Sequence, residues 1–432
     1  MASTKLQRTF SQAATSNKIG TFSFWMKRSS LTGEQVILAS PYGGSGRSFI
    51  RLENTSGQIY ATINNASDAY IPNMLFRDLS AWYHIVLAID LTQSTSTDRL
   101  KFYVNGNLIT LYATQNPPSN AETISWGQNG ILTDIGYDTR DNGGYLNALL
   151  SHVNWIDGTA YDATAFGETD AATGEWKIKT SPSVTYGTNG FFILKNGNSL
   201  TDQSGNNNNF TLASGTLTDT KDCPSNVFCT LNALSKNTYM NLYNGNTSSE
   251  TNNGNEWATV STTLGMNGGK YYCEAKVKNN SNKAVLGIYL ASLDGGSQSA
   301  LDSQRVGLNT GDGEIFVQGL WSYSPQTGLT TASNGDIYGI AFDSDNGSIQ
   351  FYYNGSTYGS AVSNSVLQNE TFMFAVQQLN TNFDWNFGNG YFATTAIATN
   401  SGNGYAGAEG ASKFNYEPPT GHSALNTKGL NA

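Results

Sequence analysis

Short stretches in which apolar and polar residues alternate recur along almost the whole chain, and turn-forming residues separate them. In the first half they cover residues 21–28, 35–40, 48–53, 58–63, 133–138 and 149–160. A period of two is typical of a half-buried β-strand. Residues 82–91 (WYHIVLAIDL) are almost continuously apolar, which predicts a central strand covered on both faces. Since no long stretch has helical periodicity, the pattern predicts an all-β fold.

One strand pattern is written twice, as LKFYVNG at 100–106 and as IQFYYNG at 349–355. In each copy every second residue is apolar, and each copy ends in Asn-Gly. Asn-Gly favours the type I′ turn of a two-residue β-hairpin, because both central residues of that turn need a positive φ. The repeat therefore predicts one equivalent hairpin in each half of the chain.

The chain divides into two strand series. The second series covers 270–278, 284–292, 305–309, 314–323, 336–345, 372–378 and 383–389. A polar, Asn-rich stretch at 200–226 lies between the two series, and 432 residues are too many for one ordinary core. We predict domains at 1–222 and 223–393. From residue 394 the periodicity is lost, which predicts an irregular Gly- and Asn-rich C-terminal tail, 394–432.

Charge and composition exclude several classes of protein. The net charge is −9 and only 13% of residues are charged, so no basic surface is available for nucleic acid. No apolar run approaches the roughly 20 residues of a membrane span, which predicts no membrane insertion. The start of the chain lacks the apolar core of a signal peptide, so we expect folding in a cytoplasm.

The chain has three cysteines, an odd number, so they cannot all pair within it. We expect Cys273, which alternates with apolar residues of its strand, to be buried. Cys223 and Cys229 are close enough in sequence to pair, but a cytoplasmic origin favours free thiols. Their pairing stays open.

Particular motifs add a family resemblance. TFSFWMKRS, AWYHIVLAID with LKFYVNG, and ALLSHVNWIDGTAY resemble laminin-G-like members of the concanavalin A-like jelly-roll superfamily. GGKYYCEAKV, VLGIYL, NGDIYGIAFDSDNGSIQFYYNG and FDWNFGN resemble a SPRY domain, which is built on a related two-sheet plan. The resemblance implies two tandem concanavalin A-like jelly-roll β-sandwiches followed by the irregular tail.

The combination, with FGETDAATGEWK, YGTNGFFI, DQSGNNNNF and PPTGHSALNTKGL, is similar to virion structural proteins of tailed bacteriophages, marine ones above all. This resemblance covers roughly residues 3–393 and the tail. It implies a non-enzymatic fibre or capsid-decorating appendage, assembled in the host cytoplasm and located in the virion. Its implied partners are other virion proteins, further copies of itself and a host-surface glycan. The alternative is a carbohydrate-binding or glycan-cleaving β-jelly-roll protein outside a virion.

The sequence offers no complete catalytic set. Laminarinase-type glucanases of this superfamily carry E-x-D-x-E on one strand, where alternate carboxylates share a face. Here Glu168 and Asp170 fit the first two places, but Ala172 stands in the third. His84, His152 and His422 are scattered and complete neither a Ser-His-Asp set nor a metal-ligand spacing. We predict no catalytic residues, and we expect His84 to be a satisfied core residue.

Glycan recognition needs exposed aromatic faces beside amide and carboxylate groups. Trp321 and Tyr323 in GLWSYSPQTG are the first candidates, and Trp126 in ISWGQNG is the next. The alternative is that these rings pack on the core or in subunit contacts. Trp25, Trp82 and Trp385 fall within predicted strands and are expected in the core.

No cofactor is required by any motif, but Ca²⁺ is considered because laminin-G-like domains often bind it through Asp, Asn and carbonyl oxygens. The candidate ligands are Asp134, Asp138 and Asp141 in DIGYDTRD, and Asp202 in the loop 202–209. The alternative is that these residues supply turns.

The segment 413–432 has too few apolar residues for a core of its own. We expect it to lie on a preformed surface, of its own domain, of a sister subunit or of another virion protein. The resulting prediction is that it carries assembly contacts, and that its deletion leaves a folded protein.

Overall fold

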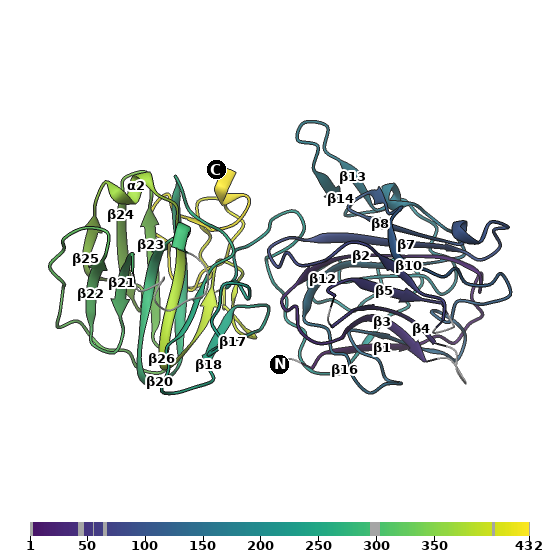
Figure 1. Cartoon of the computed structure of the whole chain (residues 1–432), viewed down its shortest axis with the longest axis horizontal. Helices are drawn as coiled ribbons and strands as arrows, with labels where there is room; N and C mark the ends of the chain where they lie inside the picture. Colours follow the sequence, from purple (N-terminus) through teal and green to yellow (C-terminus); the bar gives the residue numbers. More distant parts are fainter. Residues whose placement is uncertain are drawn as a thin grey trace. The chain divides into compact units, whose positions relative to one another are not determined.

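The computed structural model describes residues 3–41, 47–54, 56–63, 67–293, 303–399 and 402–431. It divides the chain into two compact domains, with the change from one to the other between Asp219 and Thr220. Both consist of β-sheets (Figure 1), which confirms the predicted all-β fold. In the described part of the chain the one α-helix is α2 (Val366–Asn369), and no helix there is long and apolar enough to cross a membrane.

The first domain is a sandwich of two antiparallel sheets (Figure 1). The eight-stranded sheet has the order β10 (Tyr112–Gln115), β6 (Tyr70–Pro72), β5 (Ile59–Thr62), β4 (Arg47–Leu52), β3 (Gln35–Pro41), β11 (Leu132–Ile135), β1 (Lys5–Thr9), β16 (Thr211–Ser214). The six-stranded sheet has the order β15 (Phe191–Ile193), β12 (Ala148–Asp157), β2 (Ile19–Arg28), β7 (Tyr83–Asp90), β8 (Leu100–Val104), β9 (Asn107–Leu108). Their inner faces share one apolar core.

The outer face of the six-stranded sheet is covered as well. The hairpin of β13 (Gly167–Thr169) and β14 (Trp176–Ile178) projects from this domain (Figure 1), and Trp176 of β14 packs in a cluster with Val86 and Phe166. Strand β7 is consequently buried on both faces, with Ile85 and Leu87 in the sandwich core and Val86 under the hairpin. The continuous apolar pattern at 82–91 predicted this correctly.

Two long, bent strands build the second domain: β20 (Lys270–Leu290) and β26 (Phe372–Asn386) pair along most of their length. Bulges near Val277 and Asn280 let one strand serve two layers, a known way of turning a sheet corner. One layer adds β17 (Met240–Tyr243), β18 (Ser248–Thr251), β23 (Ile337–Asp343), β24 (Ser348–Tyr353) and β25 (Ser356–Ser363); the other adds β19 (Ala258–Ser261), β21 (Arg305–Asn309) and β22 (Glu314–Gln318). Residues from both halves of β20 lie in one core.

The remaining short elements are β27 (Tyr391–Phe392), β28 (Thr395–Ala396), β29 (Ser423–Ala424) and single 3₁₀ turns at Ser96–Asp98, Ala163–Ala165, Ala291–Leu293 and Gly429–Asn431.

The repeated heptad forms the same hairpin in each domain, as predicted. LKFYVNG gives β8 with Asn105 at φ 46° and Gly106 at φ 81°; IQFYYNG gives β24 with Asn354 at φ 47° and Gly355 at φ 81°. Each asparagine side chain also accepts a backbone N–H of the preceding strand region, from His84 at 2.8 Å or from Ile337 at 2.9 Å. The resemblance between the two halves therefore extends to their hydrogen bonds.

The C-terminal segment differs from the predicted separate tail. It is irregular, but Phe414, Ala424 and Leu425 are fully buried in the second domain, and β29 pairs in parallel with β20. The buried carboxylate of Glu274 accepts hydrogen bonds from the backbone N–H groups of Asn415 and Tyr416, at 2.8 and 2.7 Å. The segment lies on its own domain because that domain offers both an apolar surface and buried acceptors.

Candidate functional site

A pocket of about 450 Å³ lies on the outer face of the layer formed by β19, β26, β20, β21 and β22. The strands place their residues in rows across this face, because paired residues in a sheet point to the same side. One row is Gln377, Val285, Asn309 and Glu314. A second row contains the paired glycines Gly287 and Gly307 beside Phe316, and a third places Tyr289 next to Arg305 and Gln318.

The glycine pair keeps the floor of the pocket low. A Cβ on Gly307 would lie 2.7 Å from the Val285 side chain and 3.0 Å from the Phe316 ring. Half-buried aromatic rings, Trp257 just before β19 and Phe316 on β22, line the pocket above this floor. Glycine inside a strand commonly marks a place where another group approaches the backbone closely.

Arg305 provides a fixed positive charge in the pocket. Its guanidinium lies 5.0 Å from the centre of the Phe316 ring and 5.8 Å from that of Tyr289. Its Nη1 donates to Gln377, and its Nε donates to Gln318 Oε1 at 3.1 Å. Only 7% of Arg305 is exposed, so these partners hold the guanidinium in one orientation.

The rim carries both signs of charge and an amide. Lys283 Nζ lies 3.3 Å from Asp312 Oδ2, and Asn309 donates to the same carboxylate oxygen at 2.7 Å. Glu314 stands directly opposite Asn309 across the strand pair. The pocket thus combines apolar ring surface with amide, guanidinium and carboxylate groups, the mixture that orients a small polar ligand with apolar faces.

The structure places the predicted glycan-binding residues differently. Trp126 is 1% exposed and packs against Phe22 and Trp155 in the first core, so it cannot stack on a sugar from solvent. Trp321 and Tyr323 are half-buried and pack against the second core, in the loop that supplies Pro325 to the pocket. Of the three strand tryptophans expected in the core, Trp385 lies in the core of the second domain. Trp25 and Trp82 are buried but lie outside the apolar core of the first domain, and the Trp25 ring stacks on His84.

Sequence reasoning missed Trp257, Phe316 and Arg305. The available signal was the alternation in β21 (RVGLN) and β22 (EIFVQ), where aliphatic residues alternate with the set that includes Arg305 and Phe316. The sequence around Trp257 contained no such signal, because the position of Trp257 beside Gln377 and Arg305 depends on the pairing of β19 with β26.

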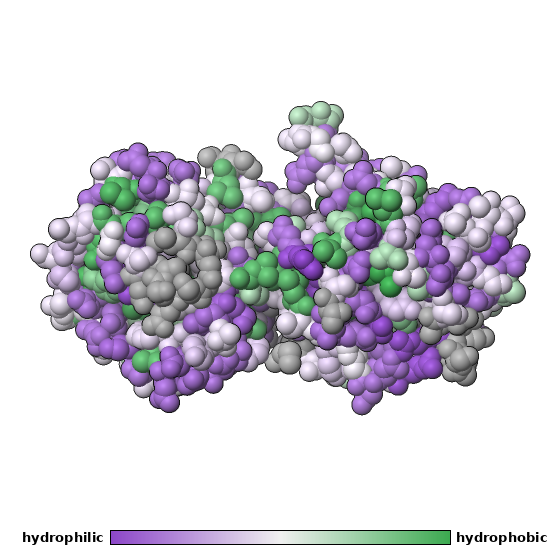
Figure 2. All heavy atoms as spheres, viewed as in Figure 1, coloured by the Kyte–Doolittle hydropathy of each residue, from purple (hydrophilic) through white to green (hydrophobic). Residues whose placement is uncertain are grey.

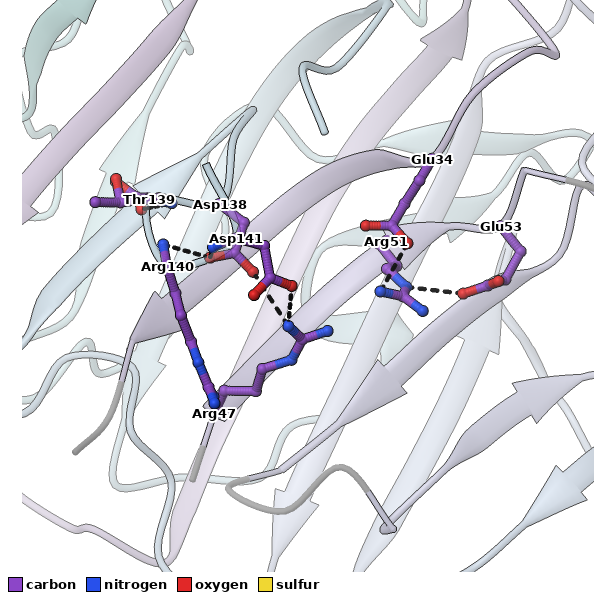
Figure 3. A network of polar contacts seen from close by, with 9 residues as sticks. Glu34, Arg47, Arg51, Glu53, Asp138, Thr139, Arg140 and Asp141 are labelled. Carbon is purple, nitrogen blue, oxygen red and sulfur yellow. Dashed lines mark hydrogen bonds and ion pairs between the residues drawn. The ribbon is translucent and has the colours of Figure 1, made fainter. Parts of the chain in front are cut away.

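The loop of Asp138 and Asp141 is closed by Arg47 rather than arranged around an open cation site. Figure 3 shows both carboxylates turned toward the Arg47 guanidinium, with Asp138 at 3.9 Å, while Asp138 also accepts from the backbone of Arg140 at 2.9 Å. Nearby, Arg51 bridges Glu34 and Glu53. A guanidinium already supplies the positive charge, so these residues do not fit a Ca²⁺ site.

The other two predicted ligands are also committed to protein donors. Asp134 accepts from Gln7 at 2.8 Å and from the Thr139 backbone at 2.9 Å. Asp202 accepts from the Phe192, Ser204 and Asn208 backbone N–H groups at 2.8 to 2.9 Å. Within the described ranges no group of three or more His, Cys, Asp or Glu side chains is placed to hold a metal ion.

The incomplete carboxylate set lies on the projecting hairpin and not on a sandwich face. Glu168 is exposed, and Asp170 accepts from the backbone of Ala172 and Thr173 and pairs with Lys177. These contacts hold the pKa of Asp170 well below its usual range. Asp170 therefore closes the hairpin turn.

His84 is a satisfied core residue, as expected. Trp176 Nε1 can only donate, and it lies 2.9 Å from His84 Nδ1, so the ring proton is on Nε2 and points to Ser23 Oγ at 3.0 Å. Burial lowers the pKa of His84 to about 3, which keeps the ring neutral. With its acceptor nitrogen occupied by Trp176, His84 cannot take a proton from Ser23. None of the three cysteines forms a disulfide, and Cys229 and Cys273 are buried.

Hydrophilic residues dominate the visible face of each domain, with hydrophobic residues in smaller groups between them (Figure 2).

Comparison with known proteins identifies a family for the first domain. Residues 4–165 match the model of the concanavalin A-like lectin/glucanases superfamily, which confirms the predicted laminin-G-like, concanavalin A-like character of this part. No curated protein matches the chain.

Several solved structures are similar at low identity. The SPRY domain of human HERC1 is 13% identical over 36% of this chain and 96% of its own, with a TM-score of 0.29. The TRIM65 PSpry domain is 15% identical over 36% of this chain and 89% of its own, also at 0.29. The native heptameric SAP-like pentraxin from Limulus polyphemus is 16% identical over 37% of this chain and 71% of its own, at 0.28.

Proposed function

We propose that this protein is a non-enzymatic structural component of a phage virion, a fibre or a capsid-decorating appendage, and that its second domain binds a host-surface glycan. The pocket between Trp257, Phe316 and Arg305 carries the glycan part of the proposal. The virion part rests on the resemblance of the whole chain to phage appendage proteins.

Sugar rings fit the chemistry of this pocket. The C–H faces of a pyranose pack against aromatic rings, and its hydroxyls need both donors and acceptors. Trp257 and Phe316 supply the rings, Arg305 and Asn309 supply donors, and Glu314 supplies an acceptor. The fixed guanidinium limits the conformational entropy lost on binding, since Gln377 and Gln318 already hold it.

The incomplete carboxylate set at Glu168 and Asp170 is consistent with a protein that binds glycans without hydrolysing them. The Glu168–Ala172 stretch lacks the third carboxylate. In the hairpin, the Asp170 carboxylate accepts hydrogen bonds from the backbone N–H groups of Ala172 and Thr173 and so has a structural role. We therefore expect laminarin, agar-type and cell-envelope glycans to survive incubation with the protein. Release of reducing ends that disappears in Glu168→Gln would overturn the non-enzymatic assignment and favour a glycan-cleaving jelly-roll protein.

The binding test uses the full chain on an array of bacterial surface polysaccharides, followed by titration of the best glycan. We expect Trp257→Ala and Phe316→Ala each to weaken binding about tenfold, roughly 1.4 kcal/mol. Trp321→Ala is the matched control, because it removes a half-buried aromatic residue of the same domain outside the pocket lining. Equal loss in all three variants, or loss in Trp321→Ala alone, would contradict the pocket assignment.

The virion test is separate. An antibody against this chain should label purified phage particles at a fibre or on the capsid surface. If the chain is absent from particles but still binds glycan, it is a carbohydrate-binding protein outside the virion.

A further inference from the structure

Strand β2 ends in the interior of the first domain with an arginine. Every second residue of β2 from Phe22 to Met26 lies in the apolar core, and Arg28 occupies the next inward position of the same alternation. Only 1% of Arg28 is exposed. A charged side chain is seldom buried to this extent unless a partner of opposite charge accompanies it.

One edge of the Arg28 guanidinium is left without a partner. Nη1 donates to the carbonyl oxygen of Phe76 at 2.5 Å, whereas Nε and Nη2 are buried and have no hydrogen-bond partner among the described residues. Nε and Nη2 form the edge with which an arginine binds two oxygens of one phosphate or carboxylate group. The hydrogen bond to Phe76 holds the guanidinium and so fixes the direction of this edge.

The charge of Arg28 is not balanced either. Burial lowers the pKa of Arg28 to about 10, against the influence of the nearby Tyr83. Arg77 adds a second positive charge, since a Cβ built on Gly57 would lie 3.7 Å from Arg28 Nη1 and 3.8 Å from Arg77 Nε. Among the described residues, no Asp or Glu forms an ion pair with either arginine. Buried water could complete the hydrogen bonds of Arg28, but two neighbouring guanidinium groups favour an anion.

We propose that Arg28, assisted by Arg77, binds a phosphate group at this end of the first domain, as free phosphate or as part of a small phosphomonoester. A phosphate dianion suits the free edge of Arg28 and the two positive charges better than a singly charged carboxylate does. An ion can reach the guanidinium beside the start of β12. There Ala148, directly paired with Arg28, and Leu150, paired with Met26, share the inward side but are only half-buried. This site does not depend on the glycan pocket of the second domain.

The test is thermal unfolding of the full chain in sodium phosphate, sodium acetate or sodium chloride at equal ionic strength, with calorimetric titration of phosphate to obtain its Kd. Hydrogen exchange of peptides from β2 assigns the effect to the first domain. Phosphate about tenfold above its Kd should raise the melting temperature of that domain by roughly 3 to 6 °C relative to chloride. Acetate, which carries a single charge, should raise it less.

Four variants test the assigned residues. Arg28→Met should melt at or above the wild-type temperature in chloride, because it removes a buried charge that has no partner, and phosphate should no longer shift it. Arg28→Lys keeps the charge but not the two-pronged edge, and should weaken phosphate binding at least about tenfold. Arg77→Gln should weaken it about threefold. Arg140→Gln, at another exposed arginine of the same domain, is the matched control and should bind like the wild type.

Equal melting temperatures of the wild type in millimolar phosphate and in chloride would overturn the proposal. So would a phosphate shift that survives in Arg28→Met, since the ion would then bind elsewhere, or wild-type affinity in Arg28→Lys. Acetate that binds as tightly as phosphate would contradict the assignment to a phosphate group.

Discussion

Gly355 ends the repeated heptad of the second domain under the ring of Tyr416, and replacing it with alanine should loosen that contact. A Cβ at this position would lie 2.6 Å from Tyr416 Cδ1 and 2.9 Å from Cε1. Tyr416 cannot move freely, because its backbone N–H is held by Glu274 at 2.7 Å. The first domain repeats the arrangement, with Gly106 at the same φ under the ring of Trp176.

Two effects add up in Gly355→Ala. Alanine at φ 81° costs about 1 kcal/mol relative to glycine. Displacing the Tyr416 ring costs roughly a further 1 to 3 kcal/mol, the range for overpacked sites. Gly328→Ala is the matched control, since Gly328 has φ 76° but nothing within 4 Å of the added Cβ. We expect a loss of about 2 to 4 kcal/mol for Gly355→Ala and about 1 kcal/mol for Gly328→Ala.

The assay is urea unfolding of the full chain, with hydrogen exchange read on peptides from β24 and, as an internal reference, from β8. Exchange separates the two domains, which need not unfold together. In a Tyr416→Ala background, Gly355→Ala should cost no more than Gly328→Ala. Equal losses for the two glycine variants in the wild-type background would refute the steric explanation.

Two further outcomes concern the C-terminal segment. Burial raises the pKa of Glu274 to about 7, above its value in the unfolded chain near 4.5, although backbone hydrogen bonds from Asn415 and Tyr416 oppose the shift. The contribution of Glu274 to the stability of the second domain should therefore be complete below about pH 4.5 and be lost as the pH rises to 7. In urea titrations at several pH values, Glu274→Gln should remove this pH dependence. A Glu274→Gln variant with the wild-type pH profile would contradict the prediction. Deleting residues 413–432 removes the buried Phe414 and Leu425, so we expect a loss of at least about 5 kcal/mol and an unfolded second domain, seen by exchange in its β24 peptides; a protected β24 would instead support a separable assembly tail.

The local sequence pattern was enough to predict most of the fold. Strand β7 and the hairpins after β8 and β24 follow from alternation and Asn-Gly alone, because these signals act within a few residues. The aromatic rings that cover Gly106 and Gly355 could not be predicted from local pattern, because Trp176 and Tyr416 lie about 60 to 70 positions further along the chain. The C-terminal segment was placed outside the domain for the same reason: its stability depends on the buried carboxylate of Glu274.

The site was harder to predict than the fold. Trp126 and Phe316 both lie near turn-rich sequence, yet Trp126 is buried between two aromatic residues while Phe316 lines a pocket. Only the register of β20, β21 and β22 decides which residues share the outer face.

The most direct measurement is a crystal or cryo-electron microscopy structure of the full chain with the glycan that binds best on the array. The glycan proposal expects a sugar ring in the pocket beside Trp257 and Phe316, with a hydroxyl or an acidic group of the ligand bound to Arg305. A glycan bound at the Trp321 loop or on the first domain, with this pocket empty, would contradict it.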